Sequence, residues 1–506
     1  MSVTRPQIFR PGITLNGDWT VNGQKGYVPE CRTEEKLVYE TDFYYDEPEP
    51  RVILHFGAAD QIADVYLNGE FLGRHIGGYL PFSFEVTGII KEENQLRVEV
   101  TDTLDHTYPY GKQRKDRGGM WYTPVSGLWQ GVWLEGVPET YMKDIRITPD
   151  LKGVTLDITV DDKGKIYKTK ERIDVEDPIL WTPDNPMLYH TKLRFRDDAV
   201  DIYYALRTVE IKKINGVNRL LLNGKPIFLH GVLDQGYFEG GGFRSRHHLI
   251  DDYENDVKRM KELGFNFIRK HIKIEDEAFY HACDKYGILV LQDMVNSGDY
   301  HYFKDTVLGS LGVPFSDKKK PDKRTEFFVK HSEETINHLY NHPCVIGYTI
   351  FNEGWGQFNS DELYERFKAL DSTRVYDSTS GWFKQKKSDF DSLHIYFRLK
   401  KLKPKKRPLL LSECGGYTLA LQQKENTYGY GRCENTEELT SKIEELYDKM
   451  VIPAIKSGLC GCVYTQLSDI EDEINGLYSF DRTVCKVDKE RMKKIAERIY
   501  AEIEKV

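Results

Sequence analysis

Apolar and polar residues alternate through the first part of the chain, in the pattern of strands that have one face buried. The alternation is clear in three runs, which are Arg51 to Phe56, Ala63 to Leu67 and Gln95 to Val100. Turn signals such as Asn68-Gly69 separate these runs, as expected of antiparallel strands joined by hairpins. The pattern predicts a β-sandwich over residues 1–137.

A second and smaller β pattern covers residues 138–214. Its clearest runs are Val154 to Val160 and Lys192 to Phe195. The segment is shorter than the roughly 100 residues typical of an immunoglobulin-like sandwich, so we expect some strands of that fold to be missing.

After the turn at Asn223-Gly224 the pattern changes to short apolar runs separated by amphipathic stretches, which is typical of parallel strands alternating with helices. A helix is expected over Asp251 to Leu263, and a last helix over Lys489 to Ile503. Eight strands are predicted, over residues 227–231, 265–269, 288–293, 345–352, 375–378, 392–396, 409–413 and 462–466. Together these elements predict a (β/α)8 barrel, also called a TIM barrel, over residues 215–506.

The composition fits a large globular chain that does not bind nucleic acid. A length of 506 residues suggests roughly three domains, and a net charge of -9 leaves no basic stripe for nucleic acid. The start, Met1 to Pro6, has no apolar signal region, and no run of about 18 apolar residues occurs anywhere. We therefore expect a soluble, cytoplasmic protein with no membrane partner.

The eight cysteines predict no metal site. Cys460-Gly461-Cys462 could be interpreted as a metal or redox pair, but it lies in an apolar run, where a thiol behaves as a small hydrophobic group. The 14 histidines show no His-Glu-x-x-His motif, which argues against a metallohydrolase on the barrel. We predict no metal and no cofactor.

Two of the predicted barrel strands end in a glutamate. The run from Val345 stops at Asn352-Glu353 followed by a glycine, and the run from Leu409 stops at Ser412-Glu413. Because the C-terminal ends of parallel barrel strands meet at one mouth, these two acids are expected to share a pocket. A pair of carboxylates in one pocket is the arrangement that hydrolyses glycosidic bonds, although either acid alone could cap the next helix.

The two motifs Asn352-Glu353 and Ser412-Glu413 resemble those of glycoside hydrolase family 2, which contains β-galactosidases, β-glucuronidases and β-mannosidases. The runs Val65 to Gly69 and Met120 to Trp129 resemble the first domain of this family. The resemblance implies a multidomain chain with an N-terminal jelly-roll β-sandwich at 1–137, a small immunoglobulin-like β-sandwich at 138–214 and a catalytic TIM barrel at 215–506.

The resemblance also implies a retaining exo-β-glycosidase that works through a covalent glycosyl-enzyme. Glu353 is then the general acid/base and Glu413 the nucleophile, while Asn352 binds the sugar 2-hydroxyl. A carbohydrate substrate is the expected partner, and a homo-oligomer is common among relatives. A non-catalytic carbohydrate-binding protein is a remoter alternative, which the presence of both acids disfavours.

Four further residues are candidates for binding the sugar. His271 matches the family's Arg-x-x-His after the second barrel strand, and Tyr396 stands where relatives place a tyrosine against the nucleophile. Asp293 and Trp382 follow the third and fifth strands, and each could equally be structural. His271 could also be an ordinary loop histidine.

Two departures from the family bear on the sugar. Galactose-cleaving relatives have an aspartate where this chain has Gly119, and glucuronidases have a lysine where this chain has Leu477. Gln466 and Tyr464, on the eighth strand, fit a neutral sugar. We expect a β-galactosidase, with a β-glucuronidase or another β-glycosidase of the family as the alternative.

Overall fold

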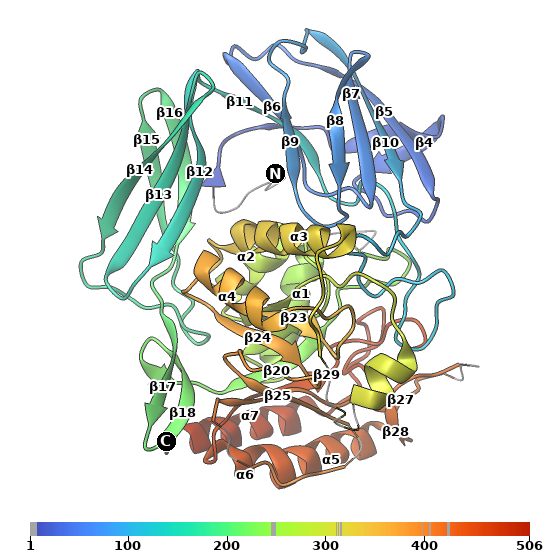
Figure 1. Cartoon of the computed structure of the whole chain (residues 1–506), viewed down its shortest axis with the longest axis vertical. Helices are drawn as coiled ribbons and strands as arrows, with labels where there is room; N and C mark the ends of the chain where they lie inside the picture. Colours follow the sequence, from blue (N-terminus) through green and yellow to red (C-terminus); the bar gives the residue numbers. More distant parts are fainter. Residues whose placement is uncertain are drawn as a thin grey trace.

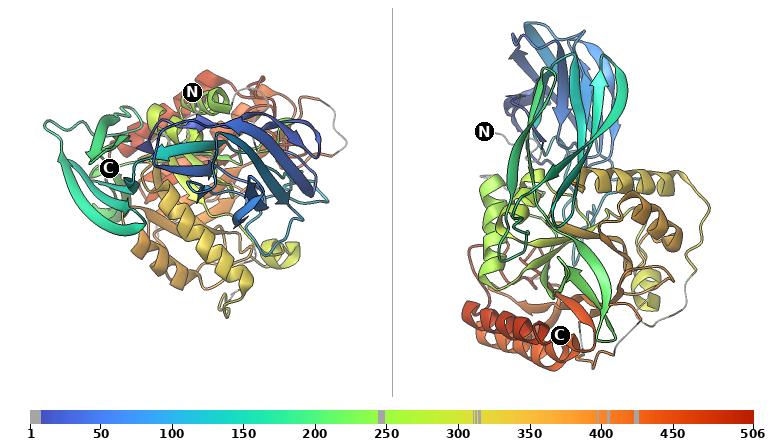
Figure 2. Two further views of the ribbon diagram at one scale, coloured as in Figure 1. Left: turned by 90° about the horizontal axis from the view of Figure 1, so that it is seen from above. Right: turned by 90° about the vertical axis from the view of Figure 1, so that its left-hand side faces the viewer.

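Three parts of the chain stack on one another in the computed structural model, with two β-sheet domains on the same side of a barrel (Figures 1 and 2). The structure describes all residues except 1–7, 244–248, 310, 312, 314–315, 397, 404–405 and 423–425. Met1 to Pro6, from which a location was predicted, therefore lie outside the described residues. None of the described helices is long and apolar enough to cross a membrane.

The first domain is a sandwich of two antiparallel sheets, as predicted. One sheet has the order β4 (Gln24–Val28), β3 (Gly17–Val21), β5 (Lys36–Tyr44), β10 (Glu93–Thr101), β7 (Ile62–Leu67) and β8 (Glu70–Ile76). The other has the order β2 (Ile13–Thr14), β11 (Val132–Val137), β6 (Arg51–Phe56) and β9 (Phe82–Glu85). Alternating residues such as Val98 and Leu54 fill one core between the sheets, which is why the period of two was visible in the sequence.

The second domain also consists of two antiparallel sheets, with a small core that includes Leu156 and Ile202. Its sheets have the orders β12 (Thr140–Pro149), β13 (Gly153–Asp162), β14 (Lys165–Asp174) and β1 (Ile8–Phe9), β16 (Asp198–Tyr204), β15 (Tyr189–Phe195). Strand β1 thus pairs with the second domain although it precedes the first. Arg10 holds it there, because its buried guanidinium contacts Asp198 and Glu135.

The barrel is a sheet of eight parallel strands, and all eight predicted strands are present. The sheet order is β24 (Val375–Ser380), β23 (Val345–Asn352), β22 (Leu289–Asp293), β21 (Phe267–Lys270), β20 (Leu229–Asp234), β29 (Leu459–Thr465), β26 (Leu409–Gly415) and β25 (Asp391–Ile395). No backbone ladder joins β24 to β25 in the described part of the chain, so the barrel is nearly closed. The hydroxyl of Ser392 donates to Asp377 across this seam.

Short elements connect and cover the barrel. A three-stranded sheet of β17 (Val209–Ile214), β18 (Val217–Leu222) and β19 (Lys225–Pro226) precedes it, and β27 (Tyr417–Leu419) pairs with β28 (Tyr430–Cys433). The helices are α1 (Leu249–Glu262), α2 (Glu277–Tyr286), α3 (Lys323–Leu339), α4 (Ser360–Leu370), α5 (Thr436–Leu446), α6 (Ile452–Ile455) and α7 (Lys489–Ile503), with π-helical turns η1 (Tyr302–Leu308) and η2 (Tyr447–Val451). The helix predicted over Asp251 to Leu263 is α1, and the predicted last helix is α7.

A loop of the first domain reaches the C-terminal end of the barrel strands. The backbone nitrogen of Tyr110 donates to the carbonyl of Asn296, 3.0 Å away, and Tyr122 donates from its hydroxyl to Glu473 over 2.5 Å. These contacts join the segment between β10 and β11 to the loops that follow β22 and β29. The first domain therefore supplies part of the surroundings of the barrel mouth.

Candidate active site

Glu353 and Glu413 lie at the C-terminal ends of their strands, on the same end of the barrel. Glu353 directly follows β23, and its φ angle of 53° together with that of the next residue, Gly354 (77°), turns the chain away from the strand. Glu413 lies near the C-terminal end of β26. Gly415 and Gly416 follow it, and they also have positive φ angles. The turn-forming glycines after each acid were the signal that located both strand ends in the sequence.

One histidine contacts both acids. The Nδ1 atom of His394 lies 2.6 Å from Oε1 of Glu353, and its Nε2 atom lies 3.6 Å from Oε1 of Glu413. Because these two nitrogens belong to one imidazole ring, the two carboxylates face each other across a single side chain. The structure therefore brings the two predicted acids together in one pocket.

Glu413 is a buried carboxylate held by two donors. The hydroxyl of Tyr396 donates to its Oε2 over 2.6 Å, and Arg269 donates from Nη1 to its Oε1 over 3.0 Å. Burial works to raise the pKa of Glu413, but His394 and Arg269 outweigh it and lower the pKa to about 2. The carboxylate is consequently ionised at neutral pH, the state that a nucleophile needs.

Arg269 connects three of the predicted site residues, Glu413, Asp293 and Asn352. Its guanidinium is fully buried and donates from Nε to Asp293 over 3.0 Å and from Nη2 to the side-chain oxygen of Asn352 over 2.8 Å. Asp293, which the sequence left open between a sugar ligand and a structural role, thus balances the charge of the arginine. Asn352 keeps its amide hydrogens free of this bond, since only its oxygen accepts from Arg269.

His271 is buried beside Asp293 and is not an exposed loop histidine. Its Nδ1 lies 2.6 Å from Oδ2 of Asp293, and only 2% of the residue is exposed. Burial, together with the nearby charge of Lys112, lowers the pKa of His271 well below its usual value, so the ring is neutral. A neutral imidazole fixed at Nδ1 presents its other nitrogen for hydrogen bonding.

Trp382 contacts the backbone of Glu353, the acid/base candidate. Its indole nitrogen donates to the carbonyl of Glu353 over 3.0 Å and to that of Asp305 over 2.7 Å. The ring also lies edge-on to His394, with 5.6 Å between the ring centroids. Trp382 therefore holds the backbone at the end of β23 through its indole N–H.

Aromatic side chains surround the two acids. Tyr430 stacks on Tyr396 with 4.3 Å between ring centroids, and Tyr428 hydrogen-bonds with Tyr430 over 3.4 Å. On another side, Trp121 of the first domain packs edge-on against Trp355 at 5.0 Å. Flat rings of this kind are the surfaces on which sugar rings stack.

Gly119 and Leu477, the two positions at which the chain departs from relatives of known sugar preference, both lie against other protein side chains. A Cβ atom at Gly119 would lie 3.4 Å from the ring of Tyr428, so this ring borders the space that an aspartate fills in galactose-cleaving relatives. Leu477 is fully buried in the barrel core, and Asn475 hydrogen-bonds with Gln466 and Glu473. The lysine of the glucuronidase motif has no counterpart at this position.

Sequence reasoning missed four residues of the site: Arg269, His394, Tyr430 and Lys112. Arg269 and His394 each interrupt an apolar barrel strand with a charged or titratable side chain, and this interruption was the available signal. Tyr430 begins the short strand β28 and Lys112 lies on a loop, and neither segment has a periodic pattern, so only the three-dimensional structure reveals them.

One group of described residues has the composition of a metal site, away from the two acids. Ligand atoms of Asp284, His342 and Cys344 lie within 4.8 Å of one another. Hydrogen bonds already use this group: Asp284 accepts from His342, from the backbone nitrogen of Cys344 and from Tyr203. Burial raises the pKa of the Cys344 thiol well above its usual value, which opposes the thiolate form that binds metals. We therefore regard the group as a structural contact.

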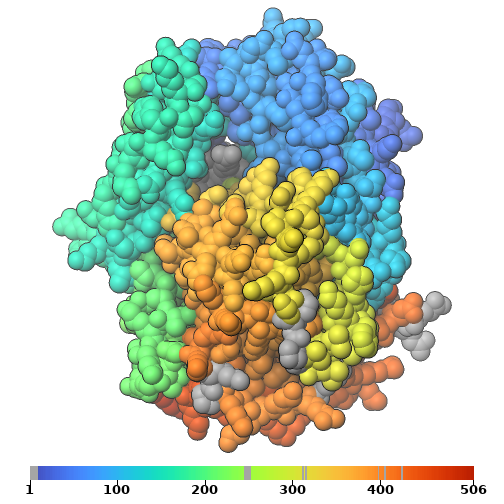
Figure 3. Space-filling view, viewed as in Figure 1, coloured from blue at the N-terminus to red at the C-terminus, as the bar shows by residue number. Residues whose placement is uncertain are grey.

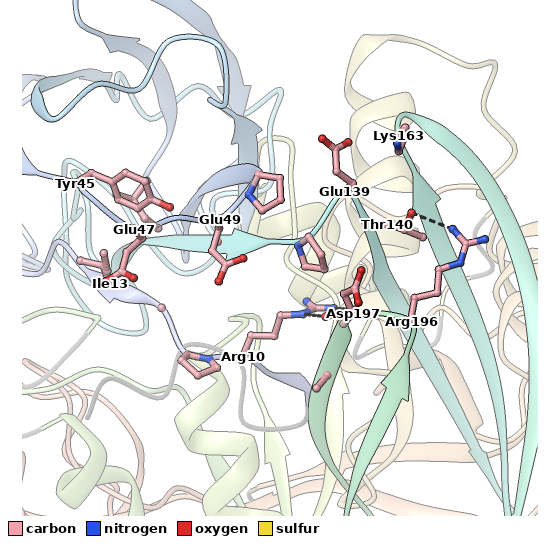
Figure 4. A pocket seen from close by; sticks show the side chains of 18 residues that line it. Arg10, Ile13, Tyr45, Glu47, Glu49, Glu139, Thr140, Lys163, Arg196 and Asp197 are labelled. Atoms are coloured by element: carbon pink, nitrogen blue, oxygen red, sulfur yellow. Dashed lines mark hydrogen bonds and ion pairs between the residues drawn. The ribbon is translucent and has the colours of Figure 1, made fainter.

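A pocket of about 840 Å³ lies between the first two domains, where the visible surface is also hollowed (Figures 3 and 4). Its lining includes Arg10, Tyr45, Glu49, Lys163 and Arg196, and no barrel residue contributes to it. Its buried charge is balanced internally, because Arg10 contacts Asp198 and Glu135. This pocket is thus separate from Glu353 and Glu413, which belong to the barrel.

The chain is similar in sequence to proteins named as glycosidases. The chain is similar at 28% identity over 301 residues to the β-galactosidase of Thermoanaerobacter pseudethanolicus, an alignment that covers 51% of this chain and 39% of the relative. It is similar at 25% identity over 386 residues to a putative β-glucuronidase of Formosa agariphila, covering 68% of this chain and 41% of the relative. The chain thus spans about two fifths of the length of these curated relatives.

Solved structures share the whole architecture. The β-D-glucuronidase of Dictyoglomus thermophilum aligns with a TM-score of 0.76 at 18% identity, covering 97% of this chain and 98% of the other. A β-galacturonidase of Eisenbergiella tayi bound to galacturonate aligns with a TM-score of 0.75 at 18% identity, covering 98% and 99%. At this level of identity the likeness concerns the fold alone.

Two family models match the chain and together cover more than half of it. "Glycosyl hydrolases family 2, TIM barrel domain" matches residues 209–450, and "Glycosyl hydrolase 2 galactose-binding domain-like" matches residues 26–127. The first matched region contains both acids, and the second contains part of the sandwich with the loop that reaches the barrel mouth. This chain is a member of glycoside hydrolase family 2.

Proposed function

We propose that the chain is a retaining exo-β-glycosidase that removes terminal β-linked sugars. The observation that carries the proposal is the single imidazole of His394 in contact with both Glu353 and Glu413. Retaining enzymes hold their two carboxyl groups only about 5–5.5 Å apart, and the contact of both acids with one ring supports such a close pair. Glu413, ionised because of Arg269 and His394, attacks the anomeric carbon.

Glu353 exchanges the proton in both steps. It protonates the oxygen of the leaving group while Glu413 forms the glycosyl-enzyme, and it then takes a proton from the water that releases the sugar. The amide hydrogens of Asn352 bind the 2-hydroxyl, with the side-chain oxygen fixed by Arg269. His271 contacts a further hydroxyl.

A β-galactoside is the substrate that we favour. The curated relatives include β-galactosidases, and the position of the glucuronidase lysine is the buried Leu477. Tyr428, beside Gly119, then provides the surface that an aspartate provides in those relatives.

A β-uronide is the second candidate, and Lys112 favours it. This lysine of the first-domain loop is one of the strongest charges acting on both His271 and Glu473, so its ammonium group lies near the site. Among the described residues its side chain forms no hydrogen bond and no ion pair. A cation without a protein partner is suited to the carboxylate of a uronic acid, and uronide-cleaving enzymes occur among the structural neighbours.

A panel of nitrophenyl β-glycosides tests the proposal, with galactoside, glucuronide, galacturonide, mannoside and glucoside as substrates. We expect cleavage of the galactoside above the others, and the substitution Glu413→Gln should reduce turnover below detection because it removes the nucleophile. Glu445→Gln, at a surface position of α5 that pairs with Lys449, is the matched control and should keep full activity.

The outcomes separate the candidates. Cleavage of the glucuronide or galacturonide alone would replace the galactoside with a uronide. Methanolysis followed by NMR of the product should give the β-methyl glycoside, and an α product would exclude retention. Turnover by Glu413→Gln at the wild-type rate would remove the nucleophile assignment.

A further inference from the structure

The mechanism with two carboxylates, as proposed above, does not use His394. The side chain of this histidine has no exposed surface. Gly381 makes room for the ring, because a Cβ atom at that position would lie 2.9 Å from Nδ1 of His394. The φ angle of Gly381 is 88°, a conformation that other residues rarely adopt. The neighbouring strand end is therefore shaped to admit this imidazole.

The shortest contact of the ring identifies the nitrogen that donates to Glu353. Nδ1 lies 2.6 Å from Oε1 of Glu353, and an ionised carboxylate can only accept hydrogen bonds, so Nδ1 carries the proton of this contact. Nε2 faces three other groups, which are the hydroxyl oxygen of Ser380 at 3.1 Å, Nη1 of Arg269 at 3.4 Å and Oε1 of Glu413 at 3.6 Å.

We propose that His394 is a positioning residue for Glu353: its Nδ1–H donates to Oε1, which leaves Oε2 as the oxygen that exchanges the proton with the substrate. Oε2 forms no hydrogen bond with any described residue. This inference rests on the proposed glycosidase function. It adds that the orientation of the acid/base carboxyl is imposed from β25, the strand that Tyr396 directly follows.

The proton balance of the reaction follows from this arrangement. In the first step the Oε2–H bond of Glu353 breaks and the proton passes to the leaving oxygen, while the bond from the anomeric carbon to that oxygen breaks and Glu413 bonds to the carbon. In the second step water gives a proton to Oε2, its oxygen bonds to the anomeric carbon, and Glu413 departs. His394 keeps the proton on Nδ1 throughout. Its hydrogen bond stabilises Glu353 most when Glu353 is ionised.

Loss of this donor should change the pH dependence of the reaction. Without Nδ1–H the ionised form of Glu353 loses a hydrogen bond, so its protonated form persists to higher pH and the alkaline limb of kcat/KM moves upward. The titratable and charged groups that face the Glu353–His394 pair are Arg269, His271, Asp293, Tyr300, Tyr396, Glu413, Tyr428 and Tyr430. Burial raises the pKa of the four tyrosines, so they stay protonated across the neutral range.

Two substitutions distinguish the two ring nitrogens. In His394→Asn the side-chain amide nitrogen occupies the place of Nδ1, whereas in His394→Gln it occupies the place of Nε2. We expect His394→Gln to lower kcat/KM about ten- to a hundredfold for a phenyl glycoside, which needs the acid, and less than about threefold for a dinitrophenyl glycoside, which does not. His394→Asn should stay within about fivefold of wild type for both.

The result that would overturn the proposal is equally specific. If His394→Gln keeps the wild-type alkaline limb and leaving-group dependence, or if both variants lose activity equally, His394 does not position Glu353 through Nδ1. Should either variant fail to fold, 15N NMR of the histidine rings in the wild-type enzyme decides, because a proton on Nε2 and not on Nδ1 would contradict the proposal. If the wild-type enzyme cleaves no aryl glycoside, the proposed function itself fails.

Discussion

Arg269 places one buried positive charge between three polar side chains of the site. A buried guanidinium is costly unless each of its donors is used, and here they reach Asp293, Asn352 and Glu413. Burial alone would lower the pKa of Arg269, but Asp293 and Glu413 raise it, so the arginine stays charged. Glu413, the proposed nucleophile, therefore remains ionised well below neutral pH, and we expect the proposed activity to fall when acid protonates it.

Tyr396 contributes the second donor to Glu413, the proposed nucleophile, and its removal should move the acid limb of the pH–rate profile. Burial and the negative charge of Glu413 raise the pKa of Tyr396 well above its usual value, so its hydroxyl stays available to donate. In Tyr396→Phe the ionised form of Glu413 loses a bond worth about 1.5–3 kcal/mol. We expect the acid limb of kcat/KM to move to higher pH, and kcat to fall about tenfold or more, in a pH–rate profile.

A matched hydroxyl removal controls for general effects on packing. Tyr464 is buried beside Tyr417, with 6.5 Å between the ring centroids, and it packs against Gly415. Tyr464→Phe should leave the acid limb in place. An acid limb that moves equally in both variants, or in neither, would contradict the role of Tyr396 against Glu413.

The site residues that could be predicted were those at the ends of apolar strands. Glu353, Glu413 and Tyr396 stand where a strand pattern stops, and parallel topology then brings them together. Arg269 and His394 were missed because a single polar residue within a short apolar run does not indicate which side chains it contacts. Their partners lie 144 and 41 residues away in the chain, as only the fold reveals.

Among the elements, helix α2 joins the second domain to the barrel. The carboxylate of its Asp284 accepts from Tyr203 of β16 over 2.7 Å, and its carbonyl accepts from the indole nitrogen of Trp181 over 2.9 Å. Asp284, Tyr203 and Trp181 are all buried. The second domain is thus attached through hydrogen bonds that water does not reach.

Loss of the Tyr203 hydroxyl should weaken this attachment measurably. Tyr203→Phe removes one hydrogen bond to a buried carboxylate, which costs about 1.5–3 kcal/mol of the free energy of unfolding. We expect the melting temperature in calorimetry to fall by roughly 3–6 °C for a chain with large domains. Tyr167→Phe, at a partly exposed position of β14, should change it by less than about 1 °C. A melting temperature that is the same in both variants would show that the bond contributes nothing.

The regular elements could be predicted and their irregular pairings could not. Eight apolar runs identified the barrel strands, because strands buried on both faces are apolar throughout. Strand β1 has two residues, too few for any period, and it reaches the second domain through Arg10. The seam between β24 and β25 depends on the pair of Ser392 and Asp377, which no strand pattern reveals.

In the molecule as a whole, the first domain and the barrel build one site. Tyr122 and Lys112 belong to the segment between β10 and β11, and the backbone nitrogen of Tyr122 donates to the carbonyl of Lys112 over 2.9 Å. The hydroxyl of Tyr122 then reaches the buried Glu473 of the barrel. Lys112 is therefore held in place by a first-domain turn that is itself bound to the barrel.

Lys112 provides a test of substrate charge. If the enzyme cleaves uronides, Lys112→Met should raise KM for the uronide about tenfold or more, because a charge-assisted hydrogen bond is lost, and should change the KM of neutral glycosides less than about threefold. Steady-state kinetics on the panel measures both values. Lys115→Met, on the same loop, is the control, since Lys115 pairs with Glu35 of the first domain. Equal effects on charged and neutral sugars would exclude a charge-recognition role.

The shared construction of the site has a consequence for recombination between relatives. A chimera that kept this barrel but took the N-terminal sandwich of another family member would retain Glu353 and Glu413 yet exchange Lys112, Trp121 and Tyr122. On the proposed mechanism, we expect bond cleavage to be inherited with the barrel and preference among sugars to depend partly on the sandwich. Swapping sandwiches between homologues is thus a route to new specificities that leaves the catalytic acids untouched.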